Sequence, residues 1–192
     1  MPTRARPRPA STFAPASFRC TLAFVDREAA LSDFDAAREE WEAAFAQVPD
    51  SALAYLKPGD DYAIGGLQVH VNWVLVHYGR ILDGIRAEPQ QELQPLDKPG
   101  ESDEANKRAR AGLTAAERKP ALEEMSGLHR FVKDTAADLS EADWSRKTPV
   151  IYGDGQDPYP TSPDDVLGWL RDHYREHVEQ CPELVASWRE MS

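Results

Sequence analysis

Four segments of the chain carry hydrophobic residues at alternating steps of three and four, the spacing of an amphipathic helix with one buried face. The segments cover about residues 26–48, 61–86, 114–139 and 162–181, and no sustained strand pattern or internal repeat accompanies them. We therefore expect an all-α fold, a four-helix bundle whose apolar faces meet in one core. The predicted inward positions are Ala30, Phe34, Ala37, Trp41, Ala44, Val48, Ala63, Leu67, His70, Val74, His77, Ile81, Gly84, Leu122, Met125, His129, Val132, Ala136, Leu139, Val166, Leu170, His173, His177 and Cys181.

Capping residues mark the starts of three of these helices. Thr114 and Glu117 have the spacing of a capping box. Ser162 followed by Pro163 combines a preferred N-cap residue with a proline at the first helical position. One of the two aspartates at 60–61 can cap the second helix, after the Pro-Gly pair that precedes it.

The segments between the helices differ in length and character. Residues 87–113 form a long polar connection that can cross the whole length of a bundle. The stretch at 106–110 favours a short helix, and we expect no residue of the connection to contribute to the core. Residues 147–161 mix Pro, Gly, Asp and aromatic residues, which predicts an ordered loop with a short extended piece. Pro182 should interrupt the last helix and leave residues 183–188 as a separate short one.

Composition narrows the class of protein. A length of 192 residues suits a single domain, and a net charge of -11 argues against a nucleic-acid partner, which would call for a basic face. No apolar run reaches the roughly 18 to 20 residues that span a bilayer, and no signal-peptide core is present, so we expect a cytoplasmic protein without membrane contact. Residues 1–24 are rich in Arg and Pro and free of acids, which predicts a flexible basic arm ahead of a domain at residues 25–192.

Histidines are the candidate functional residues. His173 and His177 lie four apart on a helical stripe, about 6 Å along one face, so both rings can reach one metal ion. A catalytic metal site usually takes three protein ligands. His70 and His77 are separated by about 10.5 Å along their helix and cannot easily share an ion. Spacing alone does not choose between them, and His129 is also a candidate.

The order of these motifs resembles the DinB-like four-helix-bundle family. The matching stretches are residues 62–70, where family members carry a His about three turns into the helix, and residues 172–177 with their His-x-x-x-His. The resemblance implies His70 as the third ligand beside His173 and His177, with a divalent metal, zinc or nickel in most cases. It also implies a transferase or isomerase acting on a small molecule with a low-molecular-weight thiol, such as bacillithiol or mycothiol. A homodimer is compatible with the sequence.

Two other interpretations remain open. Residues 173–177 also match H-x-x-E-H, the zinc-peptidase motif in which Glu176 would act as general base, although such enzymes need a further acidic ligand well downstream. The third interpretation is a non-catalytic bundle whose metal only joins the helices. Cys20 and Cys181 do not suggest a disulfide framework, and Cys181 is better explained as a small buried residue than as a ligand.

Overall fold

The computed structural model describes residues 27–87, 91–153 and 155–191. The arm predicted at residues 1–24, and with it Cys20, lies outside the described residues. The elements are α1 (Arg27–Ala46), the 3-10 helix η1 (Asp50–Ala52), α2 (Ile64–Ala87), α3 (Glu101–Ala111), α4 (Ala115–Ala137), α5 (Glu141–Trp144), β1 (Thr148–Val150), β2 (Tyr159–Thr161) and α6 (Pro163–Met191).

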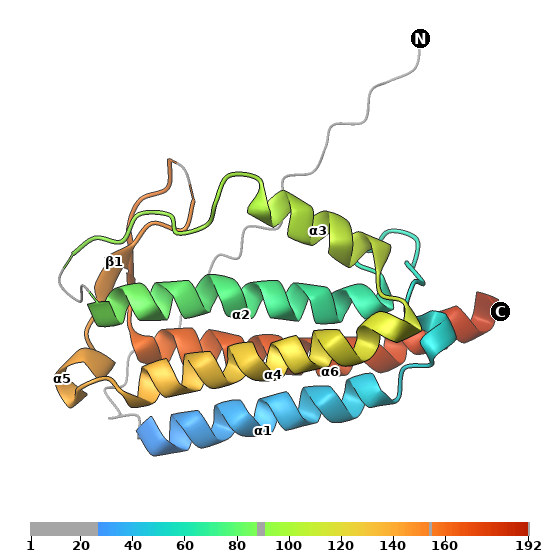
Figure 1. Ribbon diagram of the computed structural model, residues 1–192, viewed down its shortest axis with the longest axis horizontal. Coiled ribbons are helices and arrows are strands. Elements are labelled where there is room, and N and C mark those ends of the chain that lie inside the picture. The colour runs from blue at the N-terminus through green and yellow to red at the C-terminus, as the bar shows by residue number, and fades with distance from the viewer. Residues whose placement is uncertain (1–26, 88–90, 154, 192) are drawn as a thin grey trace, which may run out of the picture.

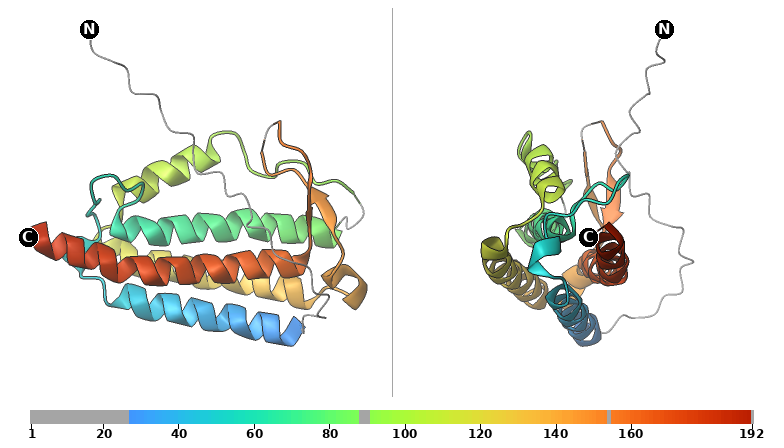
Figure 2. Two further views of the ribbon diagram at one scale, coloured as in Figure 1. Left: turned by 180° about the vertical axis from the view of Figure 1, so that it is seen from behind. Right: turned by 90° about the vertical axis from the view of Figure 1, so that its right-hand side faces the viewer.

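The four long helices α1, α2, α4 and α6 form the predicted all-α bundle (Figure 1). α1 packs chiefly against α6, and α2 packs against α4, α6 and α3. α1 and α6 run in one direction, whereas α2 and α4 run in the other (Figures 1 and 2). The parallel course of α2 and α4 explains the long connection between them, because the chain must return along the bundle before α4 can begin.

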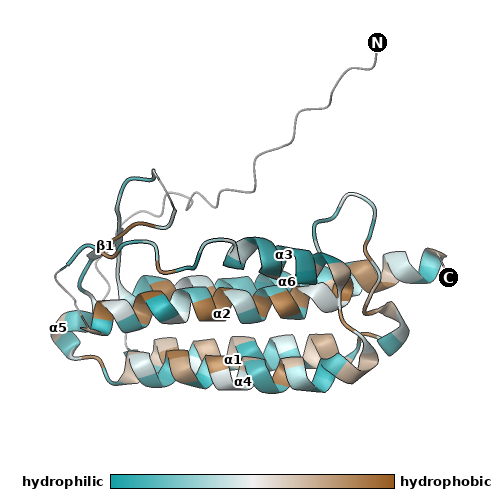
Figure 3. Ribbon diagram, turned by 45° about the horizontal axis from the view of Figure 1, so that its top comes forward, coloured by the Kyte–Doolittle hydropathy of each residue, from teal (hydrophilic) through white to brown (hydrophobic). Residues whose placement is uncertain are grey.

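The core lies between these helices and centres on α2. The largest fully buried side chains are Trp41, Tyr174, Phe34, Phe45, Leu53, Ile64, Leu67, Leu75, Ile81, Leu82, Ile85 and Met125. Figure 3 shows the hydrophobic colour repeating along α2, while α3 above it is almost entirely hydrophilic. α2 is apolar on more than one face because α3, α4 and α6 all pack against it. The sequence predicted only one buried face for this helix. None of the described helices is long and apolar enough to cross a membrane.

The start of α2 differs from the prediction. The helix begins at Ile64, and its first N–H groups donate to backbone carbonyls, Ile64 N to Tyr55 O at 2.9 Å and Gly65 N to Leu53 O at 2.8 Å. An aspartate cap at 60–61 is therefore not needed. The carbonyls come from the loop after η1, and the sequence gives no local sign of this contact.

The long connection contributes more to the fold than its composition suggested. α3 extends the predicted stretch at 106–110 to Glu101–Ala111, and Ala109 is fully buried against α2. A Cβ atom on Gly66 would lie 1.6 Å from the carbonyl oxygen of Ala109, so only glycine permits this approach. Leu93 is also buried, and its backbone forms a parallel bridge with Val150.

The two capped helices begin as predicted. Thr114 N donates to Glu117 Oε2 at 2.8 Å, and Asp165 N donates to Ser162 Oγ at 3.3 Å. The extended piece expected within 147–161 is the antiparallel pair β1 and β2, with Thr148 opposite Thr161.

The predicted break at Pro182 was wrong, because α6 continues through it to Met191. Leu184 and Val185, just beyond the proline, are buried. Their packing can offset the roughly 3 kcal/mol that an internal proline costs a helix.

Candidate metal centre

Three histidines from two helices converge between α2 and α6. His70 of α2 and His173 and His177 of α6 each offer a ring nitrogen, and the three nitrogens lie within 4.8 Å of one another. The Nε2 atoms of His173 and His177 are 3.2 Å apart. The His70 ring centre lies 4.9 Å from that of His173 and 5.5 Å from that of His177. Two histidines from one helix and one from its antiparallel neighbour thus form a single cluster.

Neighbouring side chains fix the orientation of two of the rings. His177 Nδ1 lies 2.9 Å from Gln180 Oε1, so Nδ1 is the protonated nitrogen and Nε2 keeps its lone pair. The His70 ring stacks on Tyr62 at 4.5 Å between ring centres. Tyr62 in turn donates from its hydroxyl to Asn106 Oδ1 of α3 at 3.1 Å, which links the cluster to the long connection.

A buried polar chain supports the helix around His70. Trp41 Nε1 of α1 donates to Gln68 Oε1 at 2.8 Å, and Gln68 Nε2 donates to Asn72 Oδ1 at 2.7 Å. Asn72 then donates to the carbonyl of Ala121 in α4 at 2.9 Å. These contacts tie three helices together on either side of the position that bears His70, and they satisfy polar groups that would be costly to bury alone.

Burial keeps all three imidazoles neutral. It lowers the pKa of His70 to about 3, with the charge of His177 as a second cause. It also lowers the pKa of His173 well below its usual range, and the other two histidines add to the effect. The pKa of His177 is lowered by burial as well, against the hydrogen bond to Gln180, which raises it. At neutral pH the rings therefore present lone pairs rather than positive charges.

This donor set fits a divalent metal. Each neutral imidazole keeps one unprotonated nitrogen with a lone pair, so the three rings can each offer one ligand atom to a shared ion. A metal ion can accept these lone pairs together, and imidazole suits zinc, nickel, copper and iron. Among the described residues, no further His, Cys, Asp or Glu joins this group.

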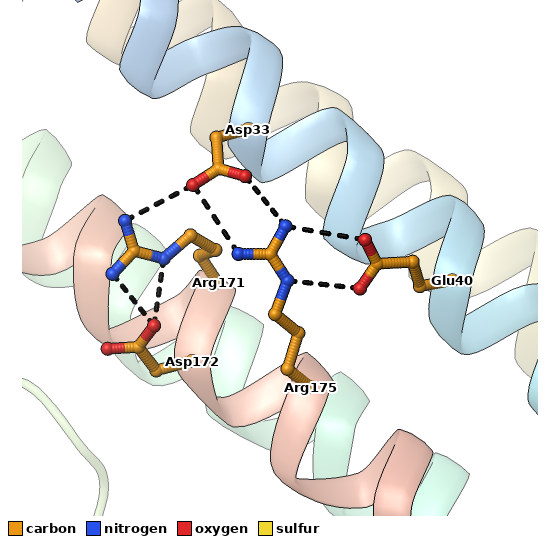
Figure 4. A network of polar contacts seen from close by, with 5 residues as sticks. All are labelled: Asp33, Glu40, Arg171, Asp172 and Arg175. Carbon is orange, nitrogen blue, oxygen red and sulfur yellow. Dashed lines mark hydrogen bonds and ion pairs between the residues drawn. The ribbon is translucent and has the colours of Figure 1, made fainter.

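The opposite face of α6 is held by an ion-pair network with α1 (Figure 4). Arg175 donates to Asp33 Oδ1 at 2.6 Å and to Glu40 Oε2 at 3.0 Å, and Arg171 reaches Asp33 at 3.3 Å and Asp172 at 2.7 Å. The Arg175 guanidinium holds the pKa of Asp33 below its usual value, although burial acts in the other direction.

The other two histidines lie outside the cluster. His77 pairs through Nδ1 with Asp97 at 2.6 Å. His129 is buried with both ring nitrogens engaged, Nε2 to Asp35 at 2.9 Å and Nδ1 to the Tyr174 hydroxyl at 3.3 Å. Of the three candidates that spacing left open for the third position, the structure brings only His70 to the pair on α6.

Two further residues singled out in the sequence also stay apart from the cluster. The side chain of Glu176 is 58% exposed, and its nearest approach to His173 is 3.9 Å at Nδ1, the nitrogen that faces away from the contact with His177. Cys181 is buried, and burial raises the pKa of its thiol to about 12, so the thiol stays protonated. Sequence reasoning missed Tyr62 and Gln180. The spacing of three between His177 and Gln180 could have indicated the second.

A family model described as the DinB superfamily matches residues 33–181. This range includes α2 and the part of α6 that carries both of its histidines. No curated protein and no solved structure matches the chain.

Proposed function

The chain belongs to the DinB superfamily, and we propose that it binds one divalent metal ion through His70, His173 and His177 and uses it to activate a low-molecular-weight thiol. Transfer of that thiol to a small electrophile, or an isomerisation that it assists, would be the reaction. The proposal is supported above all by the convergence of three neutral ring nitrogens from two helices within 4.8 Å.

The chemistry follows from the number and state of the ligands. His70, His173 and His177 would hold the metal as three ligands, and the metal would supply the acidity that lets a thiol react as a nucleophile at neutral pH. The three histidines stay neutral because burial lowers their pKa values. No side chain of the protein then has to act as nucleophile, and the one cysteine among the described residues, Cys181, is buried and protonated.

The peptidase alternative has less support. A general base must reach the water that it activates, within about 2.6 to 3.2 Å or through one further water. Glu176 is mostly exposed, and it approaches His173 at the ring nitrogen remote from His177. A purely structural metal is also less favoured, since structural zinc sites are closed by four ligands and the described residues supply three.

A direct test is turnover by the metal-loaded protein on two panels of substrates. One panel combines electrophiles with bacillithiol, mycothiol and related thiols, and the other contains peptides. We expect thiol conjugation that requires the metal and is lost in His70→Ala, His173→Ala and His177→Ala, with the peptides intact. Glu176→Gln is the matched control, and it should leave conjugation nearly unchanged because the side chain faces solvent.

Two other outcomes would change the assignment. Metal-dependent peptide cleavage that disappears in Glu176→Gln would establish the peptidase alternative instead. Stoichiometric metal binding without turnover on either panel would favour a structural metal.

A further inference from the structure

A second candidate site lies on α2, two helical turns beyond His70. A cavity of about 480 Å³ that opens to solvent is lined by His77 and Ile81 of α2, by residues 94–99 of the long connection and by residues 150–153 at the end of β1. Its volume falls within the range of small-molecule sites, roughly 300 to 1,000 Å³. None of the three clustered histidines lines this cavity.

The walls of the cavity are tied to the bundle. Leu93 N donates to the carbonyl of Pro149, and Ile151 N donates to the carbonyl of Leu93, each at 2.9 Å. On the helix side, Arg80 binds both carboxylate oxygens of Glu101, at 2.6 and 2.7 Å. The segments that form the cavity are therefore fixed by hydrogen bonds and a bidentate ion pair.

His77 is held in a defined state at the edge of this cavity. Its Nδ1 lies 2.6 Å from Asp97 Oδ2, and the hydrogen bond lowers the pKa of Asp97, although burial opposes the shift. Asp97 is thus ionised and accepts, so Nδ1 carries the proton and donates. In the neutral ring Nε2 then has a free lone pair, and no described residue hydrogen-bonds to it.

This half-satisfied state distinguishes His77 from the other histidines. His70, His173 and His177 turn ring nitrogens toward one another, and both ring nitrogens of His129 bind protein groups. His77 alone among the five combines a carboxylate on one nitrogen, an unpaired nitrogen on the other and a cavity beside it. An unprotonated nitrogen in that position can accept a hydrogen bond from a ligand.

The lining indicates the kind of molecule that would fit. Leu96 is 38% exposed at the cavity, and the hydroxyl of Tyr152 is bound to Thr161 at 2.7 Å, which leaves the Tyr152 ring as apolar surface. Asp97 is paired with His77 and Arg80, and Arg80 is also paired with Glu101. Lys98 is the other charged residue of the cavity lining. An uncharged ligand avoids competition with these pairs.

We propose that this cavity binds a small uncharged molecule with a flat apolar body and one hydroxyl group, a phenol in the simplest case, and that His77 Nε2 accepts the hydroxyl's hydrogen bond. The apolar body would lie against Leu96, Ile81 and the Tyr152 ring. The site needs no metal, so its test is independent of the function proposed for the three clustered histidines.

Two matched probes test the hydrogen bond. 4-Cyanophenol carries the hydroxyl donor, and 4-methoxybenzonitrile has the same ring and nitrile without it. Calorimetric titration of the full chain should give the phenol an affinity about tenfold higher than that of the ether, the value of one hydrogen bond of about 1.4 kcal/mol. Equal affinities, or no measurable binding of the phenol, would overturn the proposal.

Two substitutions of His77 separate its nitrogens. In His77→Asn the amide nitrogen can replace Nδ1 and keep the bond to Asp97, but nothing replaces Nε2, so the preference for the phenol should disappear. In His77→Gln the amide oxygen can reach the position of Nε2 and should keep part of the preference. Binding of the phenol that is unchanged in His77→Asn, or lost in His70→Ala, would contradict a site at His77.

A measurement on the unmodified chain covers the case in which a variant fails to fold. In protein labelled with ¹⁵N-histidine, long-range ¹H–¹⁵N spectra identify the protonated nitrogen of each ring. We expect the His77 signals to show Nδ1 protonated and Nε2 bare, and the Nε2 shift to move when 4-cyanophenol is added. An Nε2 shift that does not respond to a saturating phenol would refute the contact.

Discussion

Removal of any one clustered histidine should abolish tight metal binding. Structural zinc bound by four ligands in small peptides contributes about 10 to 16 kcal/mol, or roughly 2.5 to 4 kcal/mol per ligand. His70→Ala, His173→Ala and His177→Ala each reduce three ligands to two, so each should weaken the metal affinity by about 100- to 1,000-fold. The effect should be similar for all three, because each histidine supplies one of the three ring nitrogens of the cluster.

Metal content after dialysis against a weak chelator measures the loss, and competition with a chromophoric chelator gives the affinity. Bound metal also stabilises the fold by mass action, by about 4 kcal/mol at a free concentration 1,000 times the dissociation constant, so the unfolding temperature of the wild type should rise with added metal. His77→Asn is the control and should bind metal normally. Stoichiometric metal in the His173→Ala, His177→Ala double variant would refute the cluster as the binding site, and loss of metal in His77→Asn would show that the wrong turn of α2 was chosen.

Three further predictions concern the scaffold. Gly66→Ala should destabilise the protein by about 3 kcal/mol or more in urea unfolding, because the added Cβ atom would collide with the Ala109 carbonyl. Gly168→Ala on α6 is the control, and it should stabilise the protein by about 0.5 to 1 kcal/mol because its Cβ atom would meet nothing within 4 Å. Trp41→Phe should cost about 2 kcal/mol in the same assay, because it leaves the buried Gln68 oxygen without its donor. Hydrogen bonds from Arg80 lower the pKa of Glu101 from 4.5 to about 2, so the stability that this pair contributes is present above about pH 4.5 and is lost as the pH falls toward 2. Glu101→Gln should therefore reduce the loss of stability between pH 4.5 and pH 2, and an unchanged loss in this variant would contradict the prediction.

The helices could be predicted because their signals are local. Periodicity and capping residues lie within the segment that they describe, and the starts at Thr114 and Ser162 were confirmed by the observed hydrogen bonds. The two errors at helix ends have non-local causes. The first N–H groups of α2 find carbonyls in the loop after η1, and the turn after Pro182 is kept helical while Leu184 and Val185 are buried.

The candidate site was predictable only in part for the same reason. His173 and His177 can be paired from their spacing alone, since both lie on one helix. The choice between His70 and His77 depends on how far α2 is shifted along α6, and periodicity within α2 contains no information on that shift. The family resemblance supplied the choice of His70. The pair formed by His77 and Asp97 escaped sequence reasoning entirely, because Asp97 lies in a connection without periodicity.

The rotation of α6 about its own axis connects the fold to the cluster. Arg171 and Arg175 precede His173 and His177 by two residues each, and two residues correspond to about 200° around a helix, so the arginines and the histidines occupy roughly opposite faces. The arginines bind Asp33 and Glu40 of α1 (Figure 4). A rotation by one residue, about 100°, would break these ion pairs and turn both histidines away from His70. The partly exposed network adds only modestly to stability. Its stronger consequence is to select the rotation in which α6 presents its two imidazoles to α2, the condition for any metal chemistry at this site.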